Sequence, residues 1–378
     1  DRMTLPMTPQ PGALDGEHDL VQLLAPDGTR RHDPRYPLEV DHAQLEGWYR
    51  DLVLARRIDT EAFALQRHGE LGLWPPALGQ EAAQIGSGRA LRDQDFVFPT
   101  YRQHGVAYCR GIDPALLLGV FRGTELGGWD PQEYRYALPQ IIIGAQTLHA
   151  TGYAMGLLLD GAVGHGDAER DTAAIAYLGD GATSQGDVAE AFVWAASYQA
   201  PVVFFCENNQ YAISVPLERQ TRVPIAQRAA GFGFEGVRVD GNDVLACYAV
   251  TRAALDAARQ GFGPTLIEAV TYRVGAHTTS DDPTRYREDA ETEAWRAKDP
   301  IDRVRIHLQR EGSDAAFFAS VEAEADQLGA HLREVCGRLP EPDLVGLFDH
   351  VYTDVPEELA RQRDDAIAWQ ATDEGGDR

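Results

Sequence analysis

Residues 179–209, GDGATSQGDVAEAFVWAASYQAPVVFFCENN, decide the fold class of this chain. The apolar run at 172–179 predicts a buried strand, and Asp180 comes just past its end. The stretch from Asp187 to the break at Pro201 predicts a helix. The apolar residues expected on its sheet-facing side are Ala189, Phe192, Val193 and Ala196. The run at 201–208 predicts a second strand, so Asp180 and Asn209 are expected at the same edge of a parallel sheet.

Further apolar runs at 236–241 and 264–274 also predict strands, whereas FVFPTY at 96–101 is interpreted as a turn. The chain is therefore expected to be an α/β protein with a central, mostly parallel sheet and helices on both faces. Residues 1–40 carry six of the 21 prolines and are expected to form an extended arm at an interface or in solvent. The main domain is placed at 41–340, and a tail at 341–378 is expected to end in a helix opened by Pro356.

Composition excludes several classes of protein. With 44% hydrophobic residues over 378 positions, the chain can form a full globular core. Its 34 basic and 59 acidic residues give 34 − 59 = −25, which argues against nucleic acid and anionic membranes as partners. No apolar run approaches membrane-spanning length and no export signal is visible, so a cytoplasmic location is expected.

The reactive side chains narrow the choice further. The four cysteines are scattered without metal-site spacing, which argues against zinc and against a disulfide framework. Lys298 is the only lysine and lies in a polar stretch, which argues against a pyridoxal phosphate enzyme and a Walker phosphate loop.

Asp180 and Asn209 supply the hard oxygen ligands that Mg²⁺ prefers, and the glycines beside Asp180 allow a diphosphate to approach the backbone. Taken singly, GDG is more often a turn and Asn-Asn a solvated loop. A dinucleotide motif does not fit, because the third glycine is Gly186 and GxGxxG needs it at 184. The two signals together predict a magnesium and diphosphate site.

These residues resemble the thiamine diphosphate signature of the α subunit of 2-oxo acid dehydrogenases. The resemblance extends in the same order over roughly residues 45–310, through LGQEAAQIGSGRAL, PTYRQHG, LPQIIIGAQTLHATG, VRVDGNDV, PTLIEAVTYRVGAHTTSDDPTRYR and KDPIDRVR. It implies a thiamine diphosphate-binding fold that uses thiamine diphosphate and Mg²⁺.

The resemblance also implies roles for individual residues. The metal ligands would be Asp180, Asn209 and the carbonyl of Tyr211. The cofactor would be held by Tyr101, Arg102, Ile141, Ile143, Gly181 and Ala182, with Ile143 as a wedge. His277 would face the reacting carbon, on a loop that also carries Arg273 and Tyr286. The residues alone also allow other interpretations. Arg102 could form a surface ion pair, Ile141–Ile143 could be a buried apolar run, and His277 could be a structural histidine.

The implied activity is oxidative decarboxylation of a 2-oxo acid with transfer of the acyl group to a lipoyl group. The implied partners are a β subunit, in an α2β2 heterotetramer, and a lipoyl-bearing acyltransferase core. Pyruvate is favoured over branched-chain 2-oxo acids. The alternatives are an acetoin dehydrogenase α subunit and a non-catalytic regulatory homologue.

Two departures from the family's pattern stand out. No histidine occurs between His104 and His149, and Pro75 stands where eukaryotic pyruvate enzymes carry a pocket histidine. No carboxylate could be placed against the aminopyrimidine ring, which favours a site completed by another subunit. The segment GYAMG at 152–156 offers a helix face of small residues for close packing.

Overall fold

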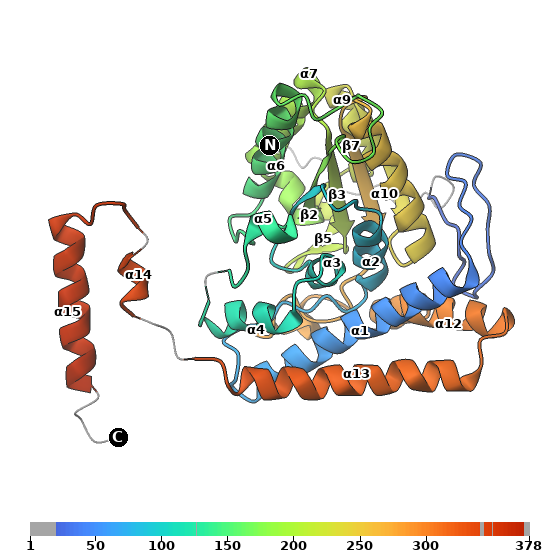
Figure 1. The fold of residues 1–378 in the computed structure, drawn as a ribbon. Coiled ribbons are helices and arrows are strands. Elements are labelled where there is room, and N and C mark those ends of the chain that lie inside the picture. The colour runs from blue at the N-terminus through green and yellow to red at the C-terminus, as the bar shows by residue number, and fades with distance from the viewer. Residues whose placement is uncertain (1–19, 126, 341–343, 350, 374–378) are drawn as a thin grey trace, which may run out of the picture.

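The computed structural model describes residues 20–125, 127–340, 344–349 and 351–373. Its centre is a five-stranded sheet in which every neighbouring pair is parallel, in the order β1-β2-β3-β7-β6 (Figure 1). The strands are β1 (Phe96–Phe98), β2 (Ala174–Gly179), β3 (Val202–Asn208), β6 (Glu235–Asp240) and β7 (Thr265–Val270). The prediction of a parallel α/β fold is confirmed.

The longer helices mostly pack around this sheet, and the last of them stands apart from the body (Figure 1). They are α1 (His42–Arg67), α2 (Glu81–Arg89), α4 (Pro114–Arg122), α6 (Ala145–Leu159), α7 (Gly186–Tyr198), α10 (Val244–Arg259), α11 (Asp289–Arg296), α12 (Pro300–Arg310), α13 (Ala315–Cys336) and α15 (Glu357–Asp373). The shorter ones are α3 (His104–Cys109), α5 (Pro131–Tyr134), α8 (Leu217–Gln220), α9 (Arg228–Phe232) and α14 (Gly346–Asp349). A small antiparallel hairpin, β4 (Tyr211–Ala212) and β5 (Val215–Pro216), follows β3.

Each face of the sheet has its own hydrophobic core, because successive side chains of a strand point to opposite faces. On β2, Ile175 and Tyr177 join the core formed with α1, α2 and α10. Ala176 and Leu178 join the core beneath α6 and α7. Both faces are thus covered by helices, which leaves the ends of the strands as the place for a site.

Two strand predictions need correction. Phe96–Phe98, interpreted as a turn, is the edge strand β1, and it pairs with Ala174–Ala176 of β2. Only three residues long and close to Pro99, it lacks the length by which a strand is recognised. The strand predicted at 264–274 ends at Val270. Beyond it the chain leaves the sheet, although Thr271 N still donates to Asn208 O at 2.9 Å.

Helix α7 forms as predicted, but its sheet-facing side is rotated by about one residue. The buried residues are Val188, Ala191, Phe192 and Ala195, whereas Ala189 and Val193 are exposed. The helix also carries apolar residues outside its buried face. Two different faces therefore show the spacing of a sheet-facing side, and the sequence pattern cannot choose between them. The outer face keeps Val193, Trp194 and Tyr198 exposed.

The described part of the expected N-terminal arm packs on its own chain. Val21 pairs with Val239 of β6, and Val21 and Leu24 are fully buried. The backbone N–H groups of Leu23 and Leu24 both donate to Asp243 at 2.6 Å. Residues 21–25 therefore pack on β6 and α10 of their own chain, whereas most residues between 31 and 39 are exposed, and residues 1–19 lie outside the described part of the chain.

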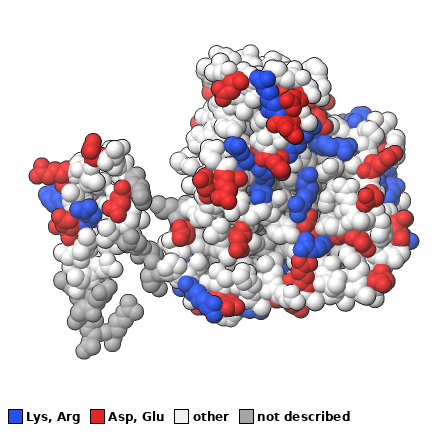
Figure 2. Space-filling view, in the orientation of Figure 1, with Lys and Arg blue, Asp and Glu red and all other residues white. Residues whose placement is uncertain are grey.

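The tail contains the helix predicted after Pro356, which is α15. Figure 1 shows α14 and α15 standing apart from the body, and several of their apolar side chains, such as Trp369, are exposed. Acidic and basic side chains are interspersed over the face drawn in Figure 2. Among the helices described, none combines the length and apolar character needed to cross a membrane.

Candidate active site

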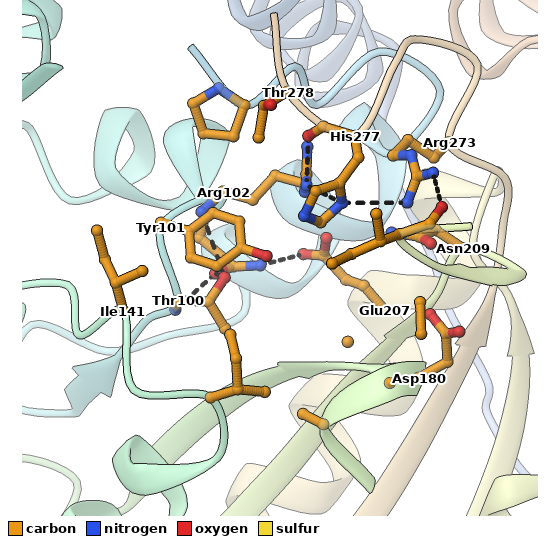
Figure 3. A pocket seen from close by; sticks show the side chains of 18 of the residues that line it. Thr100, Tyr101, Arg102, Ile141, Asp180, Glu207, Asn209, Arg273, His277 and Thr278 are labelled. Carbon is orange, nitrogen blue, oxygen red and sulfur yellow. Dashed lines mark hydrogen bonds between the residues drawn. The ribbon is translucent and has the colours of Figure 1, made fainter. Parts of the chain in front are cut away.

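A cavity of about 420 Å³ opens where β2 and β3 end (Figure 3). Among the residues proposed from the sequence, those that line it are Tyr101, Arg102, Ile141, Ile143, Asp180, Gly181, Ala182, Asn209, Tyr211, Arg273 and His277. Tyr286 does not line it. Its hydroxyl accepts from Arg273 at 3.0 Å and donates to Asp281, so it lies behind the arginine. The fold thus brings together residues up to 176 positions apart in the chain, from Tyr101 to His277 (277 − 101 = 176).

Three oxygen atoms lie close together at the end of β3, and no donated hydrogen links them. Asn209 Oδ1 faces the carbonyl oxygen of Tyr211 at 3.1 Å and Asp180 Oδ1 at 3.3 Å. Without a cation, a turn of the Asn209 amide resolves the clash by letting Nδ2 donate to both. A cation resolves it equally well. Neighbouring ligands of Mg²⁺ lie roughly 3 Å apart when the ligand distances are about 2.1 Å, which fits this cluster.

Local structure explains why the second asparagine of the pair belongs to the site. Asn208 points away, and its Nδ2 donates to Glu268 on β7 at 2.7 Å. Strand alternation then turns Asn209 toward Asp180. Within the described residues, no group of three or more His, Cys, Asp or Glu side chains is arranged around a common point. One carboxylate, one amide and one carbonyl remain as the donor set, which suits magnesium and not zinc.

Asp180 is fully buried, and burial raises the pKa of its carboxyl to about 6. Gln220 donates to its Oδ2 at 2.6 Å. Among the described residues, no Lys or Arg forms an ion pair with Asp180. The nearby charge of Arg273 and the hydrogen bond from Gln220 offset the burial of this carboxylate only in part, and a bound divalent cation would stabilise it further.

Two buried arginines face the cavity without a carboxylate partner among the described residues. Arg102 donates to the carbonyls of Pro76 and His277. Arg273 donates to the carbonyls of Tyr211 at 2.9 Å and Ile213 at 2.7 Å. Both guanidinium groups thus retain their full positive charge beside the oxygen cluster. Two guanidinium groups without a direct carboxylate partner, next to a cation site, are what a diphosphate requires, so the residues fit a metal–diphosphate group.

His277 lies between the two arginines (Figure 3). Its Nδ1 is 3.3 Å from Arg102 Nη2 and 3.3 Å from Arg273 Nη1. Guanidinium groups only donate, so Nδ1 accepts and the proton resides on Nε2. Burial and the two guanidinium charges lower the pKa of His277 to about 3. The imidazole is therefore neutral, and it enters the site as an N–H donor.

The glycine after Asp180 permits close packing. A Cβ on Gly181 would lie 2.6 Å from the Cβ of Ala212 on the β4–β5 hairpin, so a side chain there would displace the hairpin. The helix after this glycine does not begin at the cavity. A 3₁₀ turn at Asp180–Ser184 intervenes, and α7 begins only at Gly186, which does not line the cavity. Gly181 and Ala182 present their backbone from the turn instead.

Ile141–Ile143 form an exposed run at the rim of the cavity. Ile141 is 74% exposed and Ile142 is 66% exposed. The interpretation of this run as a buried apolar segment is therefore wrong. Ile141 and Ile143 both line the cavity, where a bound group or a second chain can cover them.

Sequence reasoning gave no role to Glu207, which also lines the cavity. It is fully buried, and burial raises the pKa of its carboxyl to about 7. Its two oxygens accept from Gln103 at 3.1 Å and Gln84 at 3.3 Å. Gln103 in turn accepts from the backbone N–H of Thr100 at 2.7 Å. Glu207 thus holds the loop that carries Tyr101 and Arg102, a role visible only in three dimensions.

Glutamines with unpaired atoms complete the lining. Gln80 Nε2 and Gln146 Oε1 are buried and lack a hydrogen-bond partner in the described structure. Buried polar atoms are seldom left unpaired, so both point to a polar ligand in the cavity. Gln80 belongs to the LGQEA segment, but nothing in that segment marks it as a cavity residue.

Comparisons with known proteins agree with this geometry. The family described as "Dehydrogenase E1 component" matches residues 49–326. The chain is 46% identical over 346 residues to the 3-methyl-2-oxobutanoate dehydrogenase subunit alpha of Mycobacterium tuberculosis, covering 91% of this chain and 92% of the relative. It is 38% identical over 349 residues to the pyruvate dehydrogenase E1 component subunit alpha of Staphylococcus aureus, covering 91% of each. The corresponding Staphylococcus epidermidis protein is 37% identical over 348 residues, with 91% of each chain covered.

Proposed function

The chain belongs to the dehydrogenase E1 component family, as the alpha subunit of a 2-oxo acid dehydrogenase, and from that premise we propose that it binds thiamine diphosphate with Mg²⁺ and decarboxylates a branched-chain 2-oxo acid. The observation that carries the proposal is the cluster of Asp180, Asn209 and Tyr211 oxygens beside two buried arginines that form no ion pair with a described carboxylate.

Each group has a separate task. The three oxygens would bind Mg²⁺, and Arg102 and Arg273 would bind the diphosphate with the backbone of Gly181 and Ala182. When bound, thiamine diphosphate supplies the covalent chemistry that releases carbon dioxide from the 2-oxo acid. His277, neutral and protonated on Nε2, would donate a hydrogen bond to negative charge that develops on the substrate.

The cavity wall and the relatives both support the proposed substrate class. Leu73, Pro75 and Phe121 line the cavity, and they are apolar. An apolar wall favours a branched aliphatic side chain over a single methyl group. The 46% identity to the branched-chain relative against 38% and 37% to the two pyruvate relatives points the same way, against the sequence-based preference for pyruvate.

Substrate profiling tests this proposal. The chain would be reconstituted with its β subunit, thiamine diphosphate and Mg²⁺, and turnover measured with an artificial electron acceptor. We expect kcat/KM for 3-methyl-2-oxobutanoate to exceed that for pyruvate by about 10-fold or more, given the contribution of each added methyl group in an apolar pocket. Equal or better use of pyruvate would overturn the substrate assignment. If acetoin were the only substrate turned over, the result would favour an acetoin dehydrogenase. If the complex bound the cofactor but turned over none of the substrates, the result would favour a regulatory homologue.

Replacing His277 by Ala is expected to separate cofactor binding from turnover. His277 contacts Arg102 and Arg273 but is not part of the oxygen cluster, so thiamine diphosphate should still bind. Loss of its Nε2–H should lower kcat by about 10²- to 10⁴-fold. Calorimetry and steady-state kinetics of the reconstituted enzyme measure the two effects. His331→Ala on the exposed side of α13 is the control, and normal turnover in His277→Ala would leave the histidine a structural role only.

The partners in this proposal are a β subunit in an α2β2 heterotetramer and a lipoyl-bearing acyltransferase core. The relatives named above are alpha subunits, which supports a companion β subunit. The proposed location is the cytoplasm, which agrees with the four free cysteines, since thiols stay reduced there.

A further inference from the structure

Gln220 holds the carboxylate of Asp180 from the side opposite the oxygen cluster. Its Nε2 donates to Asp180 Oδ2 at 2.6 Å, while Asp180 Oδ1 is the atom that faces Asn209. The same Nε2 donates to the carbonyl oxygen of Val215 at 2.9 Å. Both partners are acceptors, so only the nitrogen of the amide can face them and its orientation is determined. Gln220 Oε1 has no partner in the described structure.

The segment that carries Gln220 is itself fixed at the site. Arg273 donates to the carbonyls of Tyr211 and Ile213 and so anchors the β4–β5 hairpin. The backbone N–H of Leu217 donates to Gln210 O at 2.9 Å, which folds α8 back onto the end of β3. Gln220, the last residue of α8, therefore reaches Asp180 from a rigid support.

The neutrality of Gln220 matters for the metal. A Lys or Arg at this position would pair with Asp180 and compete with Mg²⁺ for its charge. An amide donor orients the carboxylate and leaves its negative charge available. Outer hydrogen-bond partners of metal-binding carboxylates act in this way in many metal sites.

We propose that Gln220 is a positioning residue that aims Asp180 Oδ1 at the magnesium ion by binding Oδ2. The inference rests on the proposed function, because it requires that Asp180 is a Mg²⁺ ligand. It adds a determinant of metal affinity that contacts neither the cofactor nor the metal.

Gln220→Met tests the inference, because Met has a similar length and cannot donate a hydrogen bond. Mg²⁺ would be titrated calorimetrically into the α2β2 complex in the presence of thiamine diphosphate, and kcat measured at saturating Mg²⁺. We expect the Mg²⁺ dissociation constant to rise by about 10- to 100-fold, while kcat at saturation stays within about twofold. Gln227→Met, at an exposed position in the same segment, should leave both values unchanged.

Gln220→Lys provides a second, independent variant, because its ammonium group should pair with Asp180 and weaken Mg²⁺ binding at least as much as Met does. If either variant bound Mg²⁺ with the wild-type dissociation constant, the inference would be wrong. A fall in kcat at saturating Mg²⁺ without a change in Mg²⁺ affinity would overturn it as well. Should the wild-type complex itself show no Mg²⁺-dependent binding of thiamine diphosphate, the proposed function fails, and that result is distinct from the other two.

Discussion

Asp180→Asn is expected to abolish Mg²⁺-dependent binding of thiamine diphosphate. Asp180 is the only anionic side chain in the oxygen cluster, and Asn is the same size but neutral. Outer-shell partners already contribute about 10- to 100-fold to metal affinity, so loss of a direct anionic ligand should cost at least about 100-fold. Calorimetry of the reconstituted complex, with and without Mg²⁺, measures the effect. Unchanged affinity and unchanged Mg²⁺ dependence would remove Asp180 from the site.

The stability of the cofactor-free variant separates this effect from misfolding. Burial raises the pKa of Asp180 to about 6, so the folded state holds this proton more tightly than the unfolded state. Stability contributed by Asp180 is therefore lost as pH rises from about 4 through 6, and at neutral pH the ionised carboxylate destabilises the free protein. Asn removes that charge. At pH 7 we expect the cofactor-free Asp180→Asn variant to melt at the wild-type temperature or above it. A lower melting temperature would instead mean that the charge of Asp180 stabilises the folded chain.

The sequence was sufficient to predict the elements that carry the site. The strands that end just before Asp180 and Asn209 are recognisable because continuous apolar runs bounded by Gly and Pro are typical of buried parallel strands. Their adjacency followed from the right-handed strand–helix–strand connection. Strand alternation decides which of the two adjacent asparagines faces Asp180, but only once the register of the strand is known. Here Asn208 faces Glu268, so Asn209 is the one that faces Asp180.

Other features could not be predicted because they depend on contacts distant in sequence. Glu207 acts on Gln84 and Gln103, more than 100 residues away, and no local pattern signals that. The outer face of α7 also carries apolar residues, Ala189, Val193 and Trp194 among them, so periodicity alone assigns the wrong register. Residues 20–40 have the composition of an arm, rich in Pro and polar residues, yet Val21 and Leu24 at its start are buried and Val21 pairs with β6.

The rim of the cavity and the outer face of α6 both suggest that a second chain covers them. Ile141 and Ile142 are largely exposed at the rim. Along α6, a Cβ on Gly152 or Gly156 would meet no atom within 4 Å, so the side of the helix that carries these two glycines is open in the described chain. Small residues on an open helix face allow another backbone to approach closely. These surfaces are consistent with a site that is completed by a β subunit.

We therefore expect the isolated chain, supplied with thiamine diphosphate and Mg²⁺, to show no 2-oxo acid decarboxylation, and the reconstituted α2β2 enzyme to be active. Among the described residues that line the cavity, only Asp180 and Glu207 carry carboxylates. Asp180 belongs to the oxygen cluster, and both oxygens of Glu207 accept from glutamine amides. Since both have contacts within this chain, we expect the carboxylate that exchanges a proton with the cofactor's aminopyrimidine to come from the partner, and its absence to lower the rate by at least about 100-fold.

The measurement compares the chain alone, the β subunit alone and the mixture, with an artificial electron acceptor in each case. Glu207→Gln in the reconstituted enzyme tests the one competing carboxylate within this chain. The amide keeps the size of Glu207 but cannot take up a proton. If Glu207 only holds the loop of Tyr101 and Arg102, the variant should lose more cofactor affinity than kcat, with kcat measured at saturating cofactor. Full turnover by the isolated chain, abolished by Glu207→Gln, would instead make Glu207 the proton-exchanging group and the site complete within a single subunit.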